Sequence, residues 1–292
     1  MVFELPKAKY VIAVSGGVDS VVLLHMLATG NYDSQFVVAH FDHGIRAESA
    51  QDAEFVAGLA EKYDLLFVSD RAELGPNASE DQARTSRYSF LRRTLKQVNA
   101  HAIITAHHQD DLLETILLHV QRGTGRAGLT PMQTQDILRP LLYVPKKDIL
   151  QYATDNNLKW REDSTNQNYE YARNKMRSLL TNTDPVILQQ LLDIHKNMVG
   201  VNQNIDAQLK DIYNYVVDNN QIVRSRFVQL PYIAQLELMY TWFKKNGVPN
   251  IQKKLISTAV IAAKTYGLHK KMSLDGSHEL ASQKNTIQIL QK

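Results

Sequence analysis

The chain has 292 residues, 44% hydrophobic and 22% charged, so it can bury a sizeable core and has room for two domains. It contains no cysteine, which excludes disulfides, thiolate metal sites and cysteine nucleophiles. No apolar run approaches the roughly 18 residues that span a membrane, and the first residues lack a signal-peptide pattern, so we expect a cytoplasmic protein with no membrane partner.

The first predicted elements are a buried strand over residues 11–14 and a helix over residues 20–27. The sequence SGGVDS, at residues 15–20, joins them. Glycine permits a positive φ and close approach of the backbone, and the N–H groups at a helix N-terminus bind anions. No lysine follows the glycines, so this is not the Gly-x4-Gly-Lys-Ser/Thr phosphate loop. The turn fits a phosphate site, and it also fits an ordinary connection between a strand and a helix.

Strand-like and helix-like segments then alternate along the first half of the chain. Short apolar runs predict strands over 35–40, 65–69 and 101–106, and helical spacing predicts helices over 47–63, 79–98 and 109–121. This alternation predicts an α/β fold, in which a parallel sheet carries helices on both faces. Ligands of such sheets bind at the carboxyl ends of the strands. We therefore expect three polar segments to share one edge: SGGVDS, AHFDHG (39–44) and AHHQDD (106–111).

The predicted helix over residues 109–121 carries two carboxylates one turn apart, Asp111 and Glu114. On a helical wheel they lie opposite an apolar stripe, which consists of Leu112, Leu113, Ile116, Leu117 and Val120. Carboxylates at this edge, beside His107 and His108, could hold a metal, a cation or an amine. A solvated acidic face is the alternative interpretation.

Two further segments have the composition of a binding surface. Arg84 and Arg87 lie one helical turn apart, which suits a phosphate or nucleotide and also an ordinary helix surface. Residues 163–177 combine polar, aromatic and basic side chains, which suits RNA contacts and also a plain surface loop.

The pattern changes after residues 139–141. Helices are predicted over 145–157, 185–217, 231–246 and 251–266, and a hairpin with a turn at Asp275-Gly276 is predicted from Lys271 to Leu290. Residues 221–292 contain eleven basic and three acidic residues, a net charge of +8, whereas the rest of the chain carries −5. This asymmetry favours a polyanionic partner, RNA or DNA first, over a surface that serves only solubility.

Together, the motifs resemble the tRNA(Ile)-lysidine synthase family, within the N-type ATP pyrophosphatase (PP-loop) superfamily. The resemblance rests on SGGVDS, HFDHGIRAES (40–49), ARTSRYSFL (83–91), AHHQDDLLETILLHVQRGTG (106–125), RPLL (139–142) and WREDSTNQNYEYARNKMR (160–177). Beyond about residue 180 it is confined to the basic helices and LDGSHEL (274–280).

The resemblance implies a Rossmann-like catalytic domain over 1–185, a helical linker over 186–220 and a small basic α+β domain for tRNA over 221–292. It implies a ligase that uses ATP and Mg²⁺ to adenylate the wobble cytidine of tRNA(Ile) with a CAU anticodon. Free L-lysine then attacks C2 of that cytidine, and AMP leaves. A homodimer is a further expectation that comes from the family alone.

Residue roles follow as expectations, for Asp111 and Glu114 from the family motif and for the others from their chemistry. ATP would be bound by Ser15, Gly16, Gly17, Val18, Asp19 and Ser20, with Asp19 as the candidate ligand of Mg²⁺. Arg87 and His107 would stabilise charge at the α-phosphate, and Asp111 and Glu114 would bind the lysine substrate. One of Asp19, Asp111 and Glu114 is expected to accept a proton. The residues expected to contact tRNA are Arg84, Arg173, Asn174, Arg177, Lys244, Lys245, Lys270 and Lys271.

Other enzyme classes explain less of the sequence. Without cysteine the chain cannot perform the thiolation chemistry of related tRNA enzymes unaided. A metal-dependent phosphoesterase would use Asp42, His43, His107, His108, Asp110 and Asp111, but it would leave SGGVDS without a purpose. An RNA-binding protein with a degenerate nucleotide fold is the non-enzymatic alternative.

Overall fold

The computed structural model describes residues 3–44, 49–75, 78–161, 176, 178–180 and 182–292. The chain divides into two compact units, Met1–Met198 and Val199–Lys292, which we call the N-terminal and C-terminal units. Among the described residues, no helix has both the length and the apolar character that a membrane span requires.

The N-terminal unit is built on a five-stranded parallel sheet. Its strands are β1 (Lys9–Ala13), β2 (Gln35–Asp42), β3 (Leu66–Arg71), β4 (Ala102–Ile104) and β5 (Ile137–Leu138), in the order β3-β2-β1-β4-β5. The predicted α/β class is confirmed. Because β1 pairs with β2 on one side and β4 on the other, the strand order reverses at β1. Such a switch point is where ligands of doubly wound sheets bind.

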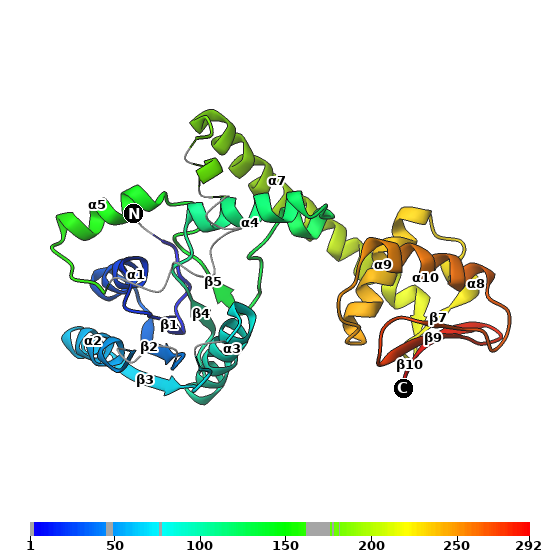
Figure 1. Cartoon of the computed structure of the whole chain (residues 1–292), viewed down its shortest axis with the longest axis horizontal. Coiled ribbons are helices and arrows are strands. Elements are labelled where there is room, and N and C mark those ends of the chain that lie inside the picture. The colour runs from blue at the N-terminus through cyan, green and yellow to red at the C-terminus, as the bar shows by residue number, and fades with distance from the viewer. Residues whose placement is uncertain (1–2, 45–48, 76–77, 162–175, 177, 181) are drawn as a thin grey trace. The chain divides into compact units, whose positions relative to one another are not determined.

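Helices cover both faces of this sheet, as the alternation of buried side chains on β1 requires (Figure 1). Tyr10 and Ile12 point to one face and pack with α1 (Val18–Thr29), α2 (Ser49–Lys62) and α5 (Lys146–Asp155). Val11 points to the other face and packs with α3 (Glu80–Gln97). Burial on both faces explains why the strands are continuous apolar runs in the sequence.

A separate apolar cluster joins α4 (Gln109–Gln121) to the first turns of α7 (Pro185–Val216). It consists of Leu112, Leu113, Ile116, Leu142 and Leu192, flanked by Met132, Leu180, Leu188 and Leu191. The last turns of α7 contribute Ile212, Tyr213 and Val216 to the core of the C-terminal unit. The segment predicted as a linker, 186–220, is therefore largely a single helix.

The C-terminal unit contains an antiparallel sheet in the order β6-β7-β10-β9-β8. Its strands are β6 (Val217–Asp218), β7 (Gln221–Val223), β8 (Lys271–Ser273), β9 (His278–Ser282) and β10 (Thr286–Gln291). The helices α8 (Arg224–Phe227), α9 (Tyr232–Lys245) and α10 (Lys253–Thr265) supply the rest of its core, with Trp242 and Phe243 fully buried.

The predicted C-terminal hairpin is part of a larger arrangement. Asp275-Gly276 does form a turn, between β8 and β9, where Asp275 Oδ1 accepts the backbone N–H of His278 at 2.8 Å. The predicted second strand is two strands, β9 and β10, and the short strands β6 and β7 complete the sheet. The strands β5, β6 and β7, the helix α8 and the 3₁₀ turn Arg126–Leu129 have no counterpart in the sequence prediction.

Candidate active site

The loop between β1 and α1 is held by its own side chains. Ser20 is buried, and its Oγ accepts the N–H groups of Ser15 and Gly16, each at 3.2 Å, while donating to the carbonyl of Gly17 at 2.8 Å. Gly16 has a φ of +94°. Gly17 caps α1 without a side-chain hydrogen bond, so the first turn, which includes Val18 and Asp19, presents a helix N-terminus at this edge.

An acidic cluster surrounds the buried imidazole of His108. Its Nε2 lies 3.8 Å from Asp19 Oδ2 on α1 and 3.6 Å from Asp111 Oδ2 on α4, and its Nδ1 lies 3.9 Å from Asp110 Oδ1. The backbone N–H of His108 also donates to Asp111 Oδ2 at 3.0 Å. The structure thus brings together the carboxylates that the sequence placed at the ends of two different strands.

Asp19 also has a cationic neighbour. Lys146 Nζ, at the start of α5, donates to Asp19 Oδ1 at 2.5 Å. The two carboxylate oxygens of Asp19 therefore face different partners, Lys146 on one side and His108 on the other.

A basic cluster forms around Tyr88 on α3. The guanidinium groups of Arg84, Arg87 and Arg92 lie 4.9, 5.5 and 5.8 Å from the ring centroid of Tyr88. Such contacts let a buried ring stabilise nearby positive charge. The predicted pair Arg84 and Arg87 is therefore part of a concentration of positive charge on α3.

Burial and nearby arginines lower the pKa of His107. Its pKa lies at about 3, chiefly because burial disfavours the charged form. Positive charge on Arg139, Arg87 and Arg84 lowers the pKa further. Its Nδ1 is hydrogen-bonded to Thr105 Oγ1 at 2.8 Å. His107 is thus neutral at pH 7, so it can offer a hydrogen bond to a phosphate but not a positive charge.

The helical-wheel prediction for α4 is wrong in one respect. Glu114, placed on the face opposite the apolar stripe, is only 7% exposed, whereas Val120, placed in that stripe, is 52% exposed. The buried face comprises Leu112, Leu113 and Ile116 together with Glu114. The apolar members of this face pack with leucines of α7, and the spacing within α4 does not reveal those contacts.

Sequence reasoning missed three cationic residues at this edge. Lys146 contacts Asp19, Arg139 acts on His107, and the backbone N–H of Arg161 donates to the Gly16 carbonyl at 3.0 Å. Arg161 also binds Asp52 Oδ1 on α2 at 2.8 Å. Arg139 and Arg161 lie within motifs quoted above, and Lys146 begins a predicted helix, but only the fold shows what each one contacts.

The other predicted residues are placed as follows. Arg173, Asn174 and Arg177 lie outside the described residues. Lys244 and Lys245 end α9, and Lys270 and Lys271 lie at the start of β8. The ammonium of Lys245 lies 3.6 Å from the ring centroid of Tyr213, and Lys271 pairs with Glu279 at 3.2 Å.

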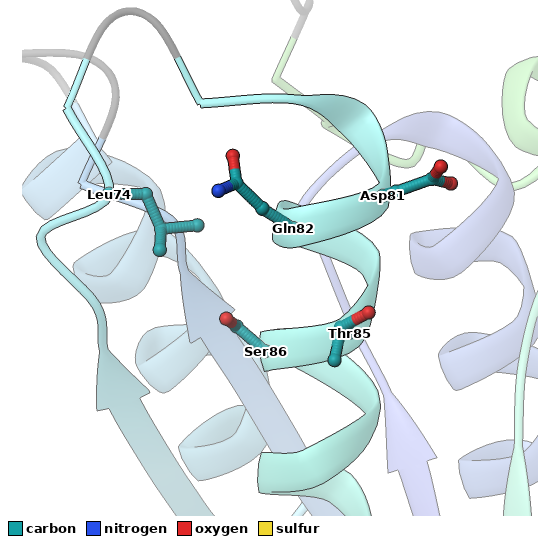
Figure 2. A pocket seen from close by; sticks show the side chains of 5 residues that line it. All are labelled: Leu74, Asp81, Gln82, Thr85 and Ser86. Atoms are coloured by element: carbon teal, nitrogen blue, oxygen red, sulfur yellow. The ribbon is translucent and has the colours of Figure 1, made fainter. Parts of the chain in front are cut away.

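A small pocket of about 310 Å³ lies beside the first turns of α3. Figure 2 shows Leu74, from the segment after β3, pointing toward Gln82 and Ser86 of α3, with Thr85 and Asp81 on the same helix. None of the predicted site residues lines it, although Arg84 and Arg87 lie on the same helix.

Comparison with known proteins identifies the family of the domain that carries this edge. The model of the PP-loop domain, an ATP-binding domain, matches residues 1–183. The chain belongs to the PP-loop family.

Comparison with curated proteins gives relatives with a more specific name. Proteins named tRNA(Ile)-lysidine synthase are 33% identical in Enterococcus faecalis, over 85% of this chain and 57% of the relative, and 41% identical in Thermus thermophilus, over 59% and 35%. One in Mycoplasma mycoides is 31% identical over 88% of this chain and 67% of the relative. The resemblance read from the motifs is confirmed, although this chain spans only about a third to two thirds of the length of these relatives.

A solved structure agrees on the fold. The U34-tRNA thiolase NcsA from Methanococcus maripaludis superposes with a TM-score of 0.56 at 17% identity, over 68% of this chain and 73% of that one. The PP-loop architecture is therefore shared with a protein of low sequence identity.

Groups of side chains that could hold a metal ion bear on the phosphoesterase alternative. In the part of the chain that the structure describes, no group of three or more His, Asp or Glu side chains is arranged to hold a metal ion. Asp42, which the phosphoesterase alternative requires, instead accepts the N–H of Gly44 at 2.8 Å and faces Arg71. The described geometry does not assemble the donor set of that alternative.

Replacing Gly16 with alanine tests the loop conformation. A Cβ at Gly16 would lie 3.6 Å from both Phe55 and Val56, which is ordinary contact, so the penalty comes from the positive φ. We expect Gly16→Ala to lower the free energy of unfolding by about 1–2 kcal/mol in urea denaturation. Gly58→Ala, in the middle of α2 with open space around it, should raise it by about 0.5–1 kcal/mol. Equal stability of Gly16→Ala and wild type would contradict the assigned backbone.

The lowered pKa of His107 predicts a dependence of stability on pH. Between pH 6.5 and about 3 the unfolded chain binds a proton at this residue and the folded chain does not, so stability falls as the pH falls. From pH 6 to pH 5 wild type should lose about 1 kcal/mol more than His107→Gln, measured by urea unfolding. Parallel pH profiles for the two proteins would show that His107 titrates normally.

Proposed function

We propose that this protein synthesises lysidine. It would use ATP and Mg²⁺ to adenylate the wobble cytidine of tRNA(Ile) with a CAU anticodon, and then join the ε-amine of free L-lysine to C2 of that cytidine, releasing AMP and pyrophosphate. One observation carries the proposal: the carboxylates of Asp19 and Asp111, from α1 and α4, converge on His108 at the switch point of a PP-loop sheet.

The loop over residues 15–20 suits the nucleotide. The N-terminus of α1 provides backbone donors and a positive dipole for a pyrophosphate group. Mg²⁺ commonly uses only one or two protein carboxylates and completes its shell with phosphates and water, so Asp19 alone fits as its protein ligand. Bound there, the ion would neutralise charge on the phosphates.

The acidic cluster suits the amine. Asp111 and Glu114 lie one turn apart on α4, with Asp111 partly exposed and Glu114 buried. Carboxylates bind the substrate as an ammonium ion, but only the free amine is a nucleophile. With an amine pKa near 10.4, its deprotonation at pH 7 costs roughly 4–5 kcal/mol. Asp19, Asp111 or Glu114 therefore has to accept the proton as well as hold the substrate.

The basic cluster suits the α-phosphate. Arg87, beside Tyr88, would stabilise negative charge there, and neutral His107 would contribute a hydrogen bond. Arg84, Arg173, Asn174 and Arg177 would contact the tRNA near the reacting nucleotide.

The C-terminal unit would bind the rest of the tRNA through its excess of positive charge. In this proposal residues 1–185 catalyse, 186–220 link and 221–292 bind tRNA, with Lys244, Lys245, Lys270 and Lys271 among the contacts. The proposal includes a cytoplasmic location, where ATP, lysine and tRNA meet, and the homodimer that the family resemblance implies.

The decisive assay measures AMP and pyrophosphate release with lysine and two transcripts, tRNA(Ile) with a CAU anticodon and tRNA(Met). We expect release only with lysine and the isoleucine transcript. Release that is independent of tRNA would indicate a small-molecule adenylating enzyme. Binding of tRNA without release would favour the RNA-binding alternative.

The same assay assigns the carboxylates. Asp19→Asn, Asp111→Asn and Glu114→Gln should each reduce turnover by about 100-fold or more, because each removes a charge or a proton acceptor. Glu61→Gln, an exposed residue of α2, makes the same chemical change away from the site and should match wild type. Wild-type turnover in all three site variants would refute their assignment.

Removing positive charge tests whether the C-terminal unit binds tRNA. Lys244 and Lys270 are exposed, and neither forms an ion pair with another described residue. In the double variant Lys244→Gln/Lys270→Gln we expect weaker tRNA binding, a salt dependence smaller by about 2 in its logarithmic slope, and unchanged ATP binding.

The matched control for this variant is Lys62→Gln/Lys96→Gln. These lysines lie in the last turns of α2 and α3, at the sheet edge opposite the candidate site, and the charge change is the same. Equal tRNA affinity and salt slope in the two double variants would exclude a specific role for the C-terminal lysines.

A further inference from the structure

The loop over residues 15–20, which we call the phosphate loop, contains no cationic side chain. SGGVDS contains two glycines and no lysine, whereas the Gly-x4-Gly-Lys-Ser/Thr loop supplies a lysine to the β- and γ-phosphates. Ser20 already occupies the N–H groups of Ser15 and Gly16. A triphosphate bears several negative charges, so a cation from another segment would complete the site.

Lys146, the first residue of α5, brings such a cation to the loop. Its Nζ lies 2.5 Å from Asp19 Oδ1, in the first turn of the helix that follows the loop, although the two residues are 127 positions apart. The side chains of Lys146 and Asp19 are 31% and 29% exposed, so the pair borders solvent and is not sealed in the core.

The backbone of Lys146 is fixed by the start of α4. Its N–H donates to Asp110 Oδ1 at 3.2 Å, and the N–H of Gln109 donates to the carbonyl of Val144 at 3.0 Å. Ile149, one turn further along α5, is fully buried in the main core. The base of the long side chain is therefore held in place, while the ammonium can change partner.

We propose that Lys146 is the phosphate-binding lysine of this site, supplied by α5 instead of by the loop. Its ammonium exchanges Asp19 for the β- and γ-phosphates of ATP, which leaves Asp19 Oδ1 available to other ligands. A partly exposed ion pair contributes little stability and exchanges readily, and a polyphosphate attracts the ammonium more strongly than one carboxylate does. The inference rests on the proposed function for the identity of the nucleotide.

Nucleotide binding without tRNA tests the inference, with isothermal titration of ATP and of AMP to the full-length protein. Lys146→Met keeps the length of the side chain and removes its charge. We expect its Kd for ATP to rise about tenfold or more and its Kd for AMP to change little, since AMP lacks the two outer phosphates. Lys146→Arg should retain most of the affinity for ATP. Lys147→Met, an exposed neighbour on the same helix, is the matched control and should bind both nucleotides as wild type does.

Three results would overturn the inference: an unchanged ATP affinity in Lys146→Met, an equal loss for ATP and AMP, or an equal loss in Lys147→Met. If Lys146→Met does not fold, Lys146→Arg becomes the test. A Lys146→Arg variant that folds but loses as much ATP affinity as is expected of a neutral side chain would also overturn the inference. Wild type that binds ATP but forms no lysidine would overturn the proposed function and leave this comparison intact. Wild type that binds no ATP would overturn both.

Discussion

The structure depends on one constraint, the burial of β1 on both faces and along both edges. Its side chains alternate between two apolar clusters, and its backbone pairs in parallel with β2 and β4. Because all three strands are parallel, the connections that follow β1 and β4 must emerge at the same end of the sheet, where the carboxyl ends of the strands lie. That geometry alone brings Asp19 and Asp111, which are far apart in the sequence, to one histidine.

Two consecutive histidines separate the charges of this edge. His108 faces the carboxylates of Asp19 and Asp111, and His107 is kept neutral by burial and by the arginines near α3. A single peptide unit between β4 and α4 thus joins an acidic region to a basic one. The proposed reaction needs both, because its nucleophile arrives as a cation and its leaving group departs as an anion.

The sequence predicted the N-terminal unit well because its strands are buried runs and its helices are long and periodic. β5, β6 and β7 have only two or three residues each, so their hydrophobic pattern is too short to detect, and pairing with neighbours defines them. The burial of Glu114 and the ion pair of Lys146 depend on contacts between distant segments. Residue spacing within one helix carries no information about them.

Asp19 links the two halves of the proposed chemistry. Oδ1 faces Lys146, on the side of the phosphate loop, and Oδ2 faces His108, on the side of the amine. If Lys146 transfers to the phosphates when ATP binds, Oδ1 of Asp19 becomes available, and the Mg²⁺ of the proposed function would bind there. The carboxylate would then exchange an ammonium for a metal ion as the nucleotide arrives, and it would stay paired with positive charge throughout. On this argument Oδ1 of Asp19 serves the nucleotide, and Oδ2, beside His108, is the oxygen left for the amine.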